Sequence, residues 1–210
     1  MEDRIYIIES PSNDNLDIAQ LEGDALYRAL ELANCDVTYK LVTSLEEFSE
    51  AFEFIIKDFY EKKGKFNAMP FIHISAHGDE NGIELTNGDE VDWIDFKDEL
   101  ENINEKIGYI LMPKGYSQTI SRIVLCFSTC KGYNSFKIWN NEQKTCPFQA
   151  VVGPTDDIEW SDSMTAFIVF YHLSNNKQLS LDKAVNQMNN SSHLSNIFRL
   201  FTSPEIGKIE

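Results

Sequence analysis

Cysteine is scarce in this sequence, and so are the features of exported and membrane proteins. Four cysteines occur in 210 residues, at positions 35, 126, 130 and 146. They are too few and too unevenly spaced for the disulfide framework of a small secreted domain, so reduced thiols are expected. No apolar run approaches the length of a membrane span, and the N-terminus lacks the basic start and apolar stretch of a secretory signal. These absences predict a cytoplasmic protein without a membrane partner.

Positive charge is also scarce. Lysine and arginine total 18 against 34 aspartates and glutamates, which gives a formal net charge of −16. Nucleic acids and anionic membrane surfaces bind basic patches, so neither is expected as a partner. The acidity is compatible with a cationic peptide or protein ligand. The plain alternative is that it only keeps the protein soluble.

Apolar strand patterns alternate with helical patterns along the chain, with no repeat, linker or low-complexity segment. We interpret residues 1–210 as a single domain, long enough to bury a full core. Strands are expected at 5–8, 37–42, 69–78, 123–127 and 148–154, and helices at 21–33, 45–59, 96–107, 136–142, 164–173 and 181–188. Ser44, Ser161 and Ser180 are expected as N-caps. Residues 194–201 fit either a last helix or a last strand.

This alternation predicts an α/β fold with a mostly parallel sheet. The strands are continuously apolar, which fits a sheet covered by helices on both faces. Asn87-Gly88, between the short runs 82–86 and 91–93, predicts a small β-hairpin. In such folds the working site lies beyond the carboxyl ends of the strands. Two of these ends carry reactive side chains, His77-Gly78 and Cys130-Lys131-Gly132.

A cysteine and a histidine at two strand ends predict nucleophilic catalysis. A cysteine attacks carbonyls as its thiolate, and a nearby imidazole makes that form available. Backbone N–H groups at sharp turns stabilise the oxyanion without reorganisation. Gly78 lets a substrate carbonyl approach closely. Cys130 follows His77 by about 50 residues, which is the separation found in caspases.

Two blocks of the sequence resemble those of caspase-like cysteine peptidases. Residues 75–82, SAHGDENG, are similar to the S-x-H-G block, and residues 128–132, STCKG, to the x-A-C-x-G block with threonine in place of alanine. The resemblance spans residues 4 to 188 and is closest to the bacterial branch related to the CHAT peptidases, separase and gingipains. The caspase sequence Q-A-C-R-G, an activation linker and the arginines of the caspase aspartate pocket have no counterpart.

The resemblance implies a caspase-like three-layer α/β/α sandwich and a peptidase that acts without a cofactor. Cys130 would be the nucleophile and His77 the acid and base, with the Gly78 and Cys130 N–H groups holding the oxyanion. In the basic-specific relatives, an acidic residue after the strand that follows the nucleophile recognises lysine or arginine. Asp157 is the first candidate for that role here, followed by Asp156 and Asp162. The alternative is a solvated loop whose acids favour the N-terminus of the next helix.

Other reactive side chains receive plainer interpretations. His73 and Cys126 lie within apolar strands and are expected in the core. A tetrahedral zinc site built from these two residues with His77 and Cys130 is rejected, because side chains four apart on a strand lie about 13 Å apart. Trp93 and Trp160 are interpreted as packing residues, with a role in a substrate groove as the alternative.

The sequence thus predicts a cysteine endopeptidase that cleaves protein or peptide substrates through Cys130 and His77, after lysine or arginine. A regulatory protein subunit or sensor is expected to restrain it. Bacterial defence or regulated cell death is the context that the resemblance suggests. The alternative from another class is a catalytically weak caspase-like scaffold that binds and signals to a partner protein.

Overall fold

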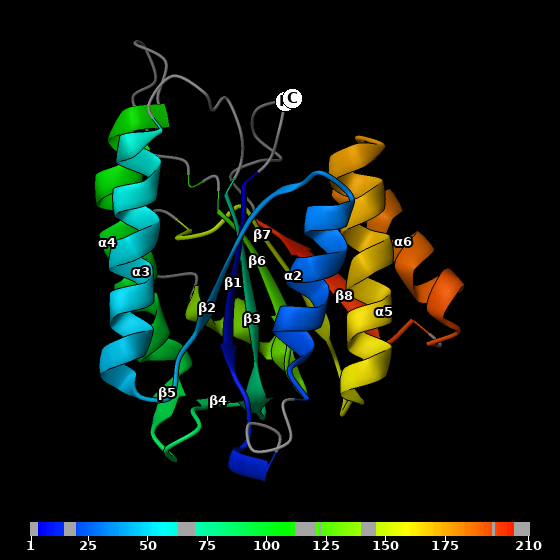
Figure 1. Ribbon diagram of the computed structural model, residues 1–210, viewed down its shortest axis with the longest axis horizontal. Helices are drawn as coiled ribbons and strands as arrows, with labels where there is room; N and C mark the ends of the chain where they lie inside the picture. The colour runs from blue at the N-terminus through cyan, green and yellow to red at the C-terminus, as the bar shows by residue number, and fades with distance from the viewer. Residues whose placement is uncertain are drawn as a thin grey trace.

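The computed structural model describes residues 4–14, 20–62, 70–111, 121, 123–139, 146–194 and 196–203. Helices flank a central sheet on both sides, which gives the predicted three-layer architecture (Figure 1). The strands are β1 (Arg4–Ser10), β2 (Asp36–Leu41), β3 (Pro70–Gly78), β4 (Gly82–Glu84), β5 (Glu90–Asp92), β6 (Val124–Ser128), β7 (Ala150–Pro154) and β8 (Phe198–Thr202). The helices are α2 (Glu22–Leu32), α3 (Leu45–Glu61), α4 (Trp93–Leu111), the 3-10 helix η1 (Gly132–Ile138), α5 (Trp160–Tyr171), the π-helix η2 (His172–Asn176) and α6 (Leu181–Ser192). None of the helices in these ranges is long and apolar enough to cross a membrane.

The main sheet has the strand order β2-β1-β3-β6-β7-β8. The first five of these strands are parallel, and β8 runs antiparallel to β7. The predicted hairpin is present as β4 and β5, and β4 pairs with the end of β3. The carboxyl ends of the parallel strands therefore meet at one edge, the lower edge in Figure 1, beside the hairpin.

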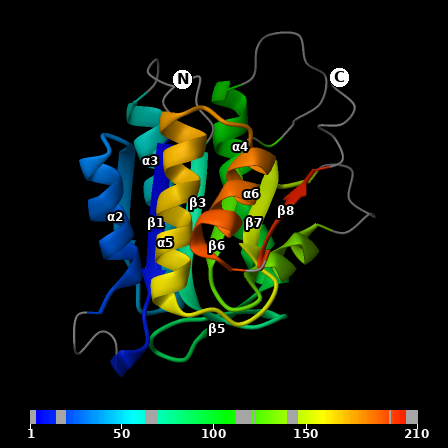
Figure 2. The same ribbon diagram turned by 90° about the vertical axis from the view of Figure 1, so that its right-hand side faces the viewer.

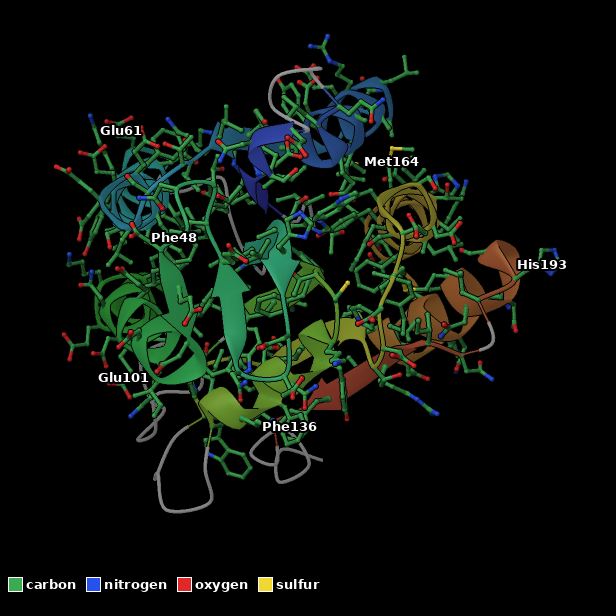
Figure 3. All side chains as sticks on the ribbon, turned by 90° about the horizontal axis from the view of Figure 1, so that it is seen from below. Phe48, Glu61, Glu101, Phe136, Met164 and His193 are labelled. Atoms are coloured by element: carbon green, nitrogen blue, oxygen red, sulfur yellow. The ribbon has the colours of Figure 1, made fainter. Side chains whose placement is uncertain are left out.

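The core lies on both faces of the sheet because successive strand residues point to opposite sides. On β1, Ile5 and Ile7 pack in one apolar cluster while Tyr6 and Ile8 pack in the other. Helices α3 and α4 cover one face, and α2, α5 and α6 cover the other (Figures 1 and 2). Figure 3, which looks along the sheet from its carboxyl edge, shows Phe48 of α3 on the opposite side from Met164 of α5. The continuously apolar strands are thus buried on both faces, as predicted.

The helix starts agree only partly with the predicted caps. Ser44 caps α3 by accepting from the Glu47 N–H at 3.4 Å. Ser180 occupies the N-cap position of α6, but its side chain makes no cap hydrogen bond there. The predicted cap at Ser161 is wrong, because α5 begins one residue earlier at Trp160 and its N-cap is Glu159.

Two further segments refine the prediction. The helix expected at 136–142 is replaced by η1, which begins at Gly132, directly after the cysteine turn; residues 140–142 lie outside the described residues. The tail forms the strand β8 rather than a helix, and it closes the sheet beside β7. The turn that holds Cys130 is therefore bounded by a strand on one side and a short helix on the other.

Candidate active site

His77 and Cys130 lie side by side because of the register between β3 and β6. The last paired residues of these parallel strands are Ser75 and Ser128, and His77 and Cys130 each follow two positions later. Neighbouring strands run about 4.8 Å apart. Between the two levels, the Thr129 hydroxyl donates to the Ala76 carbonyl oxygen at 2.5 Å and holds the two chain ends together. The structure therefore brings together the two residues that the sequence singled out.

The turn after β6 is a tight one. Lys131 adopts the left-handed conformation with φ of 55°, and the Gly132 N–H donates to the Thr129 carbonyl at 3.0 Å. A Cβ at Gly132 would lie 2.6 Å from the Cβ of Phe127, so only glycine fits. Cys130, at the apex, is partly buried, and its Sγ lies 3.9 Å from the carbonyl oxygen of Ile158. The turn thus presents the thiol at a fixed place on the sheet edge.

Gly78 is placed to donate a hydrogen bond toward this turn. The Asp79 N–H donates to the Gly82 carbonyl, and His77 pairs with Glu84 in the same antiparallel ladder. Hydrogen-bonded pairs alternate along such a ladder, so the Gly78 N–H points away from β4. The Ala76 carbonyl, which lies on the same side of β3, accepts from Thr129 of β6. The Gly78 N–H is therefore directed toward the side on which Cys130 lies.

Trp160 contacts the histidine. The His77 ring is exposed, and its centroid lies 5.4 Å from that of Trp160 in an edge-on arrangement with an interplanar angle of 74°. Trp160 is the first residue of α5. The packing interpretation of Trp93 is confirmed, since it lies in the core, whereas Trp160 packs on His77 itself.

The acidic loop after β7 lies partly beside the cysteine turn. The Asp156 carbonyl oxygen accepts from the Lys131 N–H at 3.1 Å. The pKa of Lys131 is raised, first by its hydrogen bond and ion pair with Glu80 and then by the charges of Asp157 and Asp156. Both aspartates are exposed. Asp162 instead lies exposed in the first turn of α5 and is not brought to the turn by any contact within the described residues.

A group of buried polar residues under the strand ends was not predicted as part of the site. The Ser128 hydroxyl donates to Glu22 Oε1 at 3.0 Å, accepts from the Ser163 hydroxyl at 2.9 Å, and lies 3.0 Å from His73 Nε2. His73 Nδ1 in turn lies 3.0 Å from the Tyr171 hydroxyl. The signal in the sequence was the spacing, because Ser75 and Ser128 stand two residues before His77 and Cys130 and so share their face of the sheet.

Burial sets the protonation states of this group. Desolvation raises the pKa of Glu22 to about 8 and lowers that of His73 to about 3, so both are neutral near pH 7. The expectation that His73 and Cys126 belong to the core is confirmed, since neither is exposed. Burial raises the pKa of Cys126 to about 12, which makes it an inert thiol.

No family model matches this sequence, and no curated protein matches it in sequence. The solved structure of the Arg-specific cysteine proteinase gingipain R (RgpB) has a similar fold, with a TM-score of 0.50 at 8% identity over 95% of this chain and 46% of that chain. A complex of the pro- and mature domains of Porphyromonas gingivalis RgpB gives a TM-score of 0.49 at 9% identity, over 95% and 47%. This chain spans about half the length of those chains. At such low identity the likeness shows the caspase-like fold alone.

Proposed function

We propose that this chain is a cysteine endopeptidase in which Cys130 is the nucleophile and His77 the acid and base. The observation that carries the proposal is the shared register of β3 and β6, which sets both residues two positions beyond the Ser75–Ser128 pair. Cys130 also follows directly on Thr129, whose hydrogen bond to Ala76 fixes the spacing of the two strand ends. Rigid elements that hold a nucleophile beside its base are what covalent catalysis requires.

The reaction uses two tetrahedral intermediates. The Cys130 thiolate attacks the scissile carbonyl carbon, and the electron pair of the C=O bond moves to oxygen. The carbonyl re-forms as the C–N bond breaks, and the protonated His77 gives its proton to the leaving amine. His77 then takes a proton from water as that water attacks the thioester. Collapse of the second intermediate releases the carboxylic acid product and restores the Cys130 thiolate and protonated His77.

Backbone N–H groups would stabilise both intermediates. The Gly78 N–H is directed away from β4 and toward β6, and the Cys130 N–H belongs to the tight turn. The Lys131 N–H is not available, because it donates to the Asp156 carbonyl. Oxyanion donors of this kind lower the barrier without reorganisation. A side chain at position 78 is excluded, since its Cβ would lie 2.6 Å from the Gly82 carbonyl oxygen.

We further propose that cleavage follows lysine or arginine. The net charge of −16 favours cationic substrates. Asp157 and Asp156 are exposed beside the cysteine turn, where a substrate would pass, whereas Asp162 is set back on α5. Lys131 already faces the two loop aspartates and offsets part of their charge.

Gating by a partner protein is the second part of the proposal. The Cys130 thiol lies against the Ile158 carbonyl oxygen at 3.9 Å, an arrangement that suits a neutral thiol donor rather than a thiolate. Lys131 also ties the turn to the loop that contains Asp156. A partner that moved this loop would release the thiol toward His77. In its absence the chain would behave as a weakly active scaffold.

Covalent labelling tests the assignment directly. A peptidyl-arginine chloromethyl ketone should modify Cys130 alone, as located by mass spectrometry, and a fluorogenic peptide library should show cleavage. Cys130→Ala and His77→Ala should each reduce kcat/KM at least about 100-fold. Cys126→Ala is the matched control and should retain activity, because Cys126 is fully buried. Loss of activity in Cys126→Ala with none in Cys130→Ala would refute the assignment, and labelling only after a cell extract is added would identify gating.

A further inference from the structure

Glu22 is a buried carboxyl group with an unused oxygen. The residue is 7% exposed, and its Oε2 atom has no hydrogen-bond partner among the described residues. The hydroxyl of Ser75, which is 1% exposed, is likewise without a hydrogen bond of good geometry, although it lies close enough to Glu22 to oppose the rise in its pKa. Buried polar atoms are nearly always hydrogen-bonded, so two neighbouring exceptions point to a missing ligand.

This group lies directly along the strands from the dyad. Ser75 and Ser128 precede His77 and Cys130 by two residues each, so their side chains share one face of the sheet with the dyad. Two residues of a strand span roughly 6.6 Å. A substrate whose carbonyl rests at Cys130 would therefore reach Glu22 with a side chain as long as the four-carbon stem of lysine. Ser128, which donates to Glu22 Oε1, connects the carboxyl to this route.

The surroundings of Glu22 offer no compensating positive charge. Glu9 of β1 is close enough to raise its pKa, and Glu9 itself accepts hydrogen bonds from the Gly23 and Asp24 N–H groups of α2 and from Tyr39 of β2. On the other sides stand Ser128 of β6, His73 of β3 and Tyr171 of α5. Of these, only His73 is basic, and burial keeps it neutral. Glu22 consequently carries a proton in the unbound chain.

We propose that Glu22, flanked by Ser75 and Ser128, receives the cationic side chain of the residue before the scissile bond and gives up its proton when that side chain binds. This inference rests on the proposed peptidase function and names a second carboxyl, below the dyad, as the determinant of specificity. The exchange is balanced: the carboxylic acid and the cation form a carboxylate–cation pair, and one proton passes to solvent. Glu22 is the first residue of α2, so displacement of the helix start uncovers it.

The proposal predicts a preference that depends on pH. The probes are an acetylated dipeptide amide that ends in arginine and its citrulline counterpart, which has the same shape without the charge. They are bound to the Cys130→Ala variant, so that no cleavage is needed. The arginine-over-citrulline affinity ratio should rise at least about 10-fold between pH 6 and pH 8, because the cation no longer has to displace a proton. Taking the ratio cancels the titration of His77, and calorimetry in buffers of different ionisation enthalpy should detect one released proton at pH 6.

Two variants separate this carboxyl from the acidic loop. Glu22→Gln in the same background should lose about 10- to 100-fold of the arginine preference while citrulline binding stays unchanged. Asp157→Asn, the matched control, should keep both the preference and its pH dependence. A preference that survives Glu22→Gln, that is lost instead in Asp157→Asn, that does not change with pH, or that is absent from both pH values overturns the proposal. If the binding pattern is found but the wild-type chain cleaves neither peptide, the peptidase function fails and the Glu22 site stands.

Discussion

The Thr129 hydroxyl donates a hydrogen bond to the Ala76 carbonyl oxygen at 2.5 Å, and this bond joins the residues immediately before Cys130 and His77. It lies beyond the last backbone pair of β3 and β6, where the two strands would otherwise be free to separate. Threonine at this position is also where the sequence departs from the alanine of the caspase-like block. The departure therefore has a structural role in fixing the distance between the two proposed catalytic residues.

Thr129→Val should remove this link at nearly constant volume. The Ala76 carbonyl would remain buried without its donor, so we expect the free energy of unfolding to fall by about 1–3 kcal/mol. The value of kcat should fall more than KM changes, because the spacing of the dyad is lost rather than substrate binding. Thr165→Val, which removes an exposed hydroxyl bond to Ser161 within α5, is the control and should alter neither quantity. Urea unfolding and steady-state kinetics measure the two effects, and equal behaviour of the two variants would contradict the proposed role.

Gly132→Ala should destabilise the cysteine turn. Its Cβ would lie 2.6 Å from the Cβ of Phe127, a fully buried side chain that has no room to yield. Overpacking of this kind costs typically about 1–3 kcal/mol, and the turn would move with Cys130 on it. The expected result is a lower midpoint of unfolding in urea together with slower labelling of Cys130 by the chloromethyl ketone.

Gly88→Asn is the control for this substitution. Gly88 lies in the hairpin turn at φ of 88°, where nothing stands within 4 Å of a Cβ. Asparagine tolerates positive φ better than most residues, so a small loss of stability and unchanged labelling are expected. Unchanged stability of Gly132→Ala would show that the turn adapts, and the rigid presentation of Cys130 would have to be abandoned.

The free energy of unfolding should depend on pH through Glu22. Burial raises its pKa from 4.5 to about 8, so the folded protein holds a proton that the unfolded chain has released between these values. The stabilisation from this group is complete below about pH 4.5 and is lost as the pH rises to about 8. Glu22→Gln should remove this decline and exceed the wild type at pH 9 by on the order of a few kcal/mol. Glu46→Gln, on the exposed side of α3, should follow the wild-type curve in urea titrations from pH 5 to 9; a wild-type curve without the decline would mean that Glu22 is ionised.

The fold and the two strand ends could be predicted because they depend on local patterns. Continuous apolar runs identified the parallel strands, and parallel strands share their carboxyl edge, so His77 and Cys130 had to meet near one another. The start of α5 was missed because Trp160 carries no capping signal, whereas Ser161 does. Glu22 was missed for a deeper reason. A glutamate at a helix start normally indicates an exposed acid near the helix dipole, and its burial here depends on contacts with residues more than 100 positions away.

Trp160 should act as a positioning residue for His77. Its ring meets the imidazole edge-on at 5.4 Å and limits the orientations that an otherwise exposed side chain can take. Trp160→Ala should lower kcat about 10-fold with little change in KM and shift the acid limb of the pH–rate profile, because the imidazole loses its aromatic neighbour. Trp160→Phe should restore most of the activity. Trp139→Ala is the matched control, since Trp139 is a partly buried tryptophan that packs on Phe201. It should lower the free energy of unfolding without moving the pH profile, and an equal shift in both variants would assign Trp160 to packing alone.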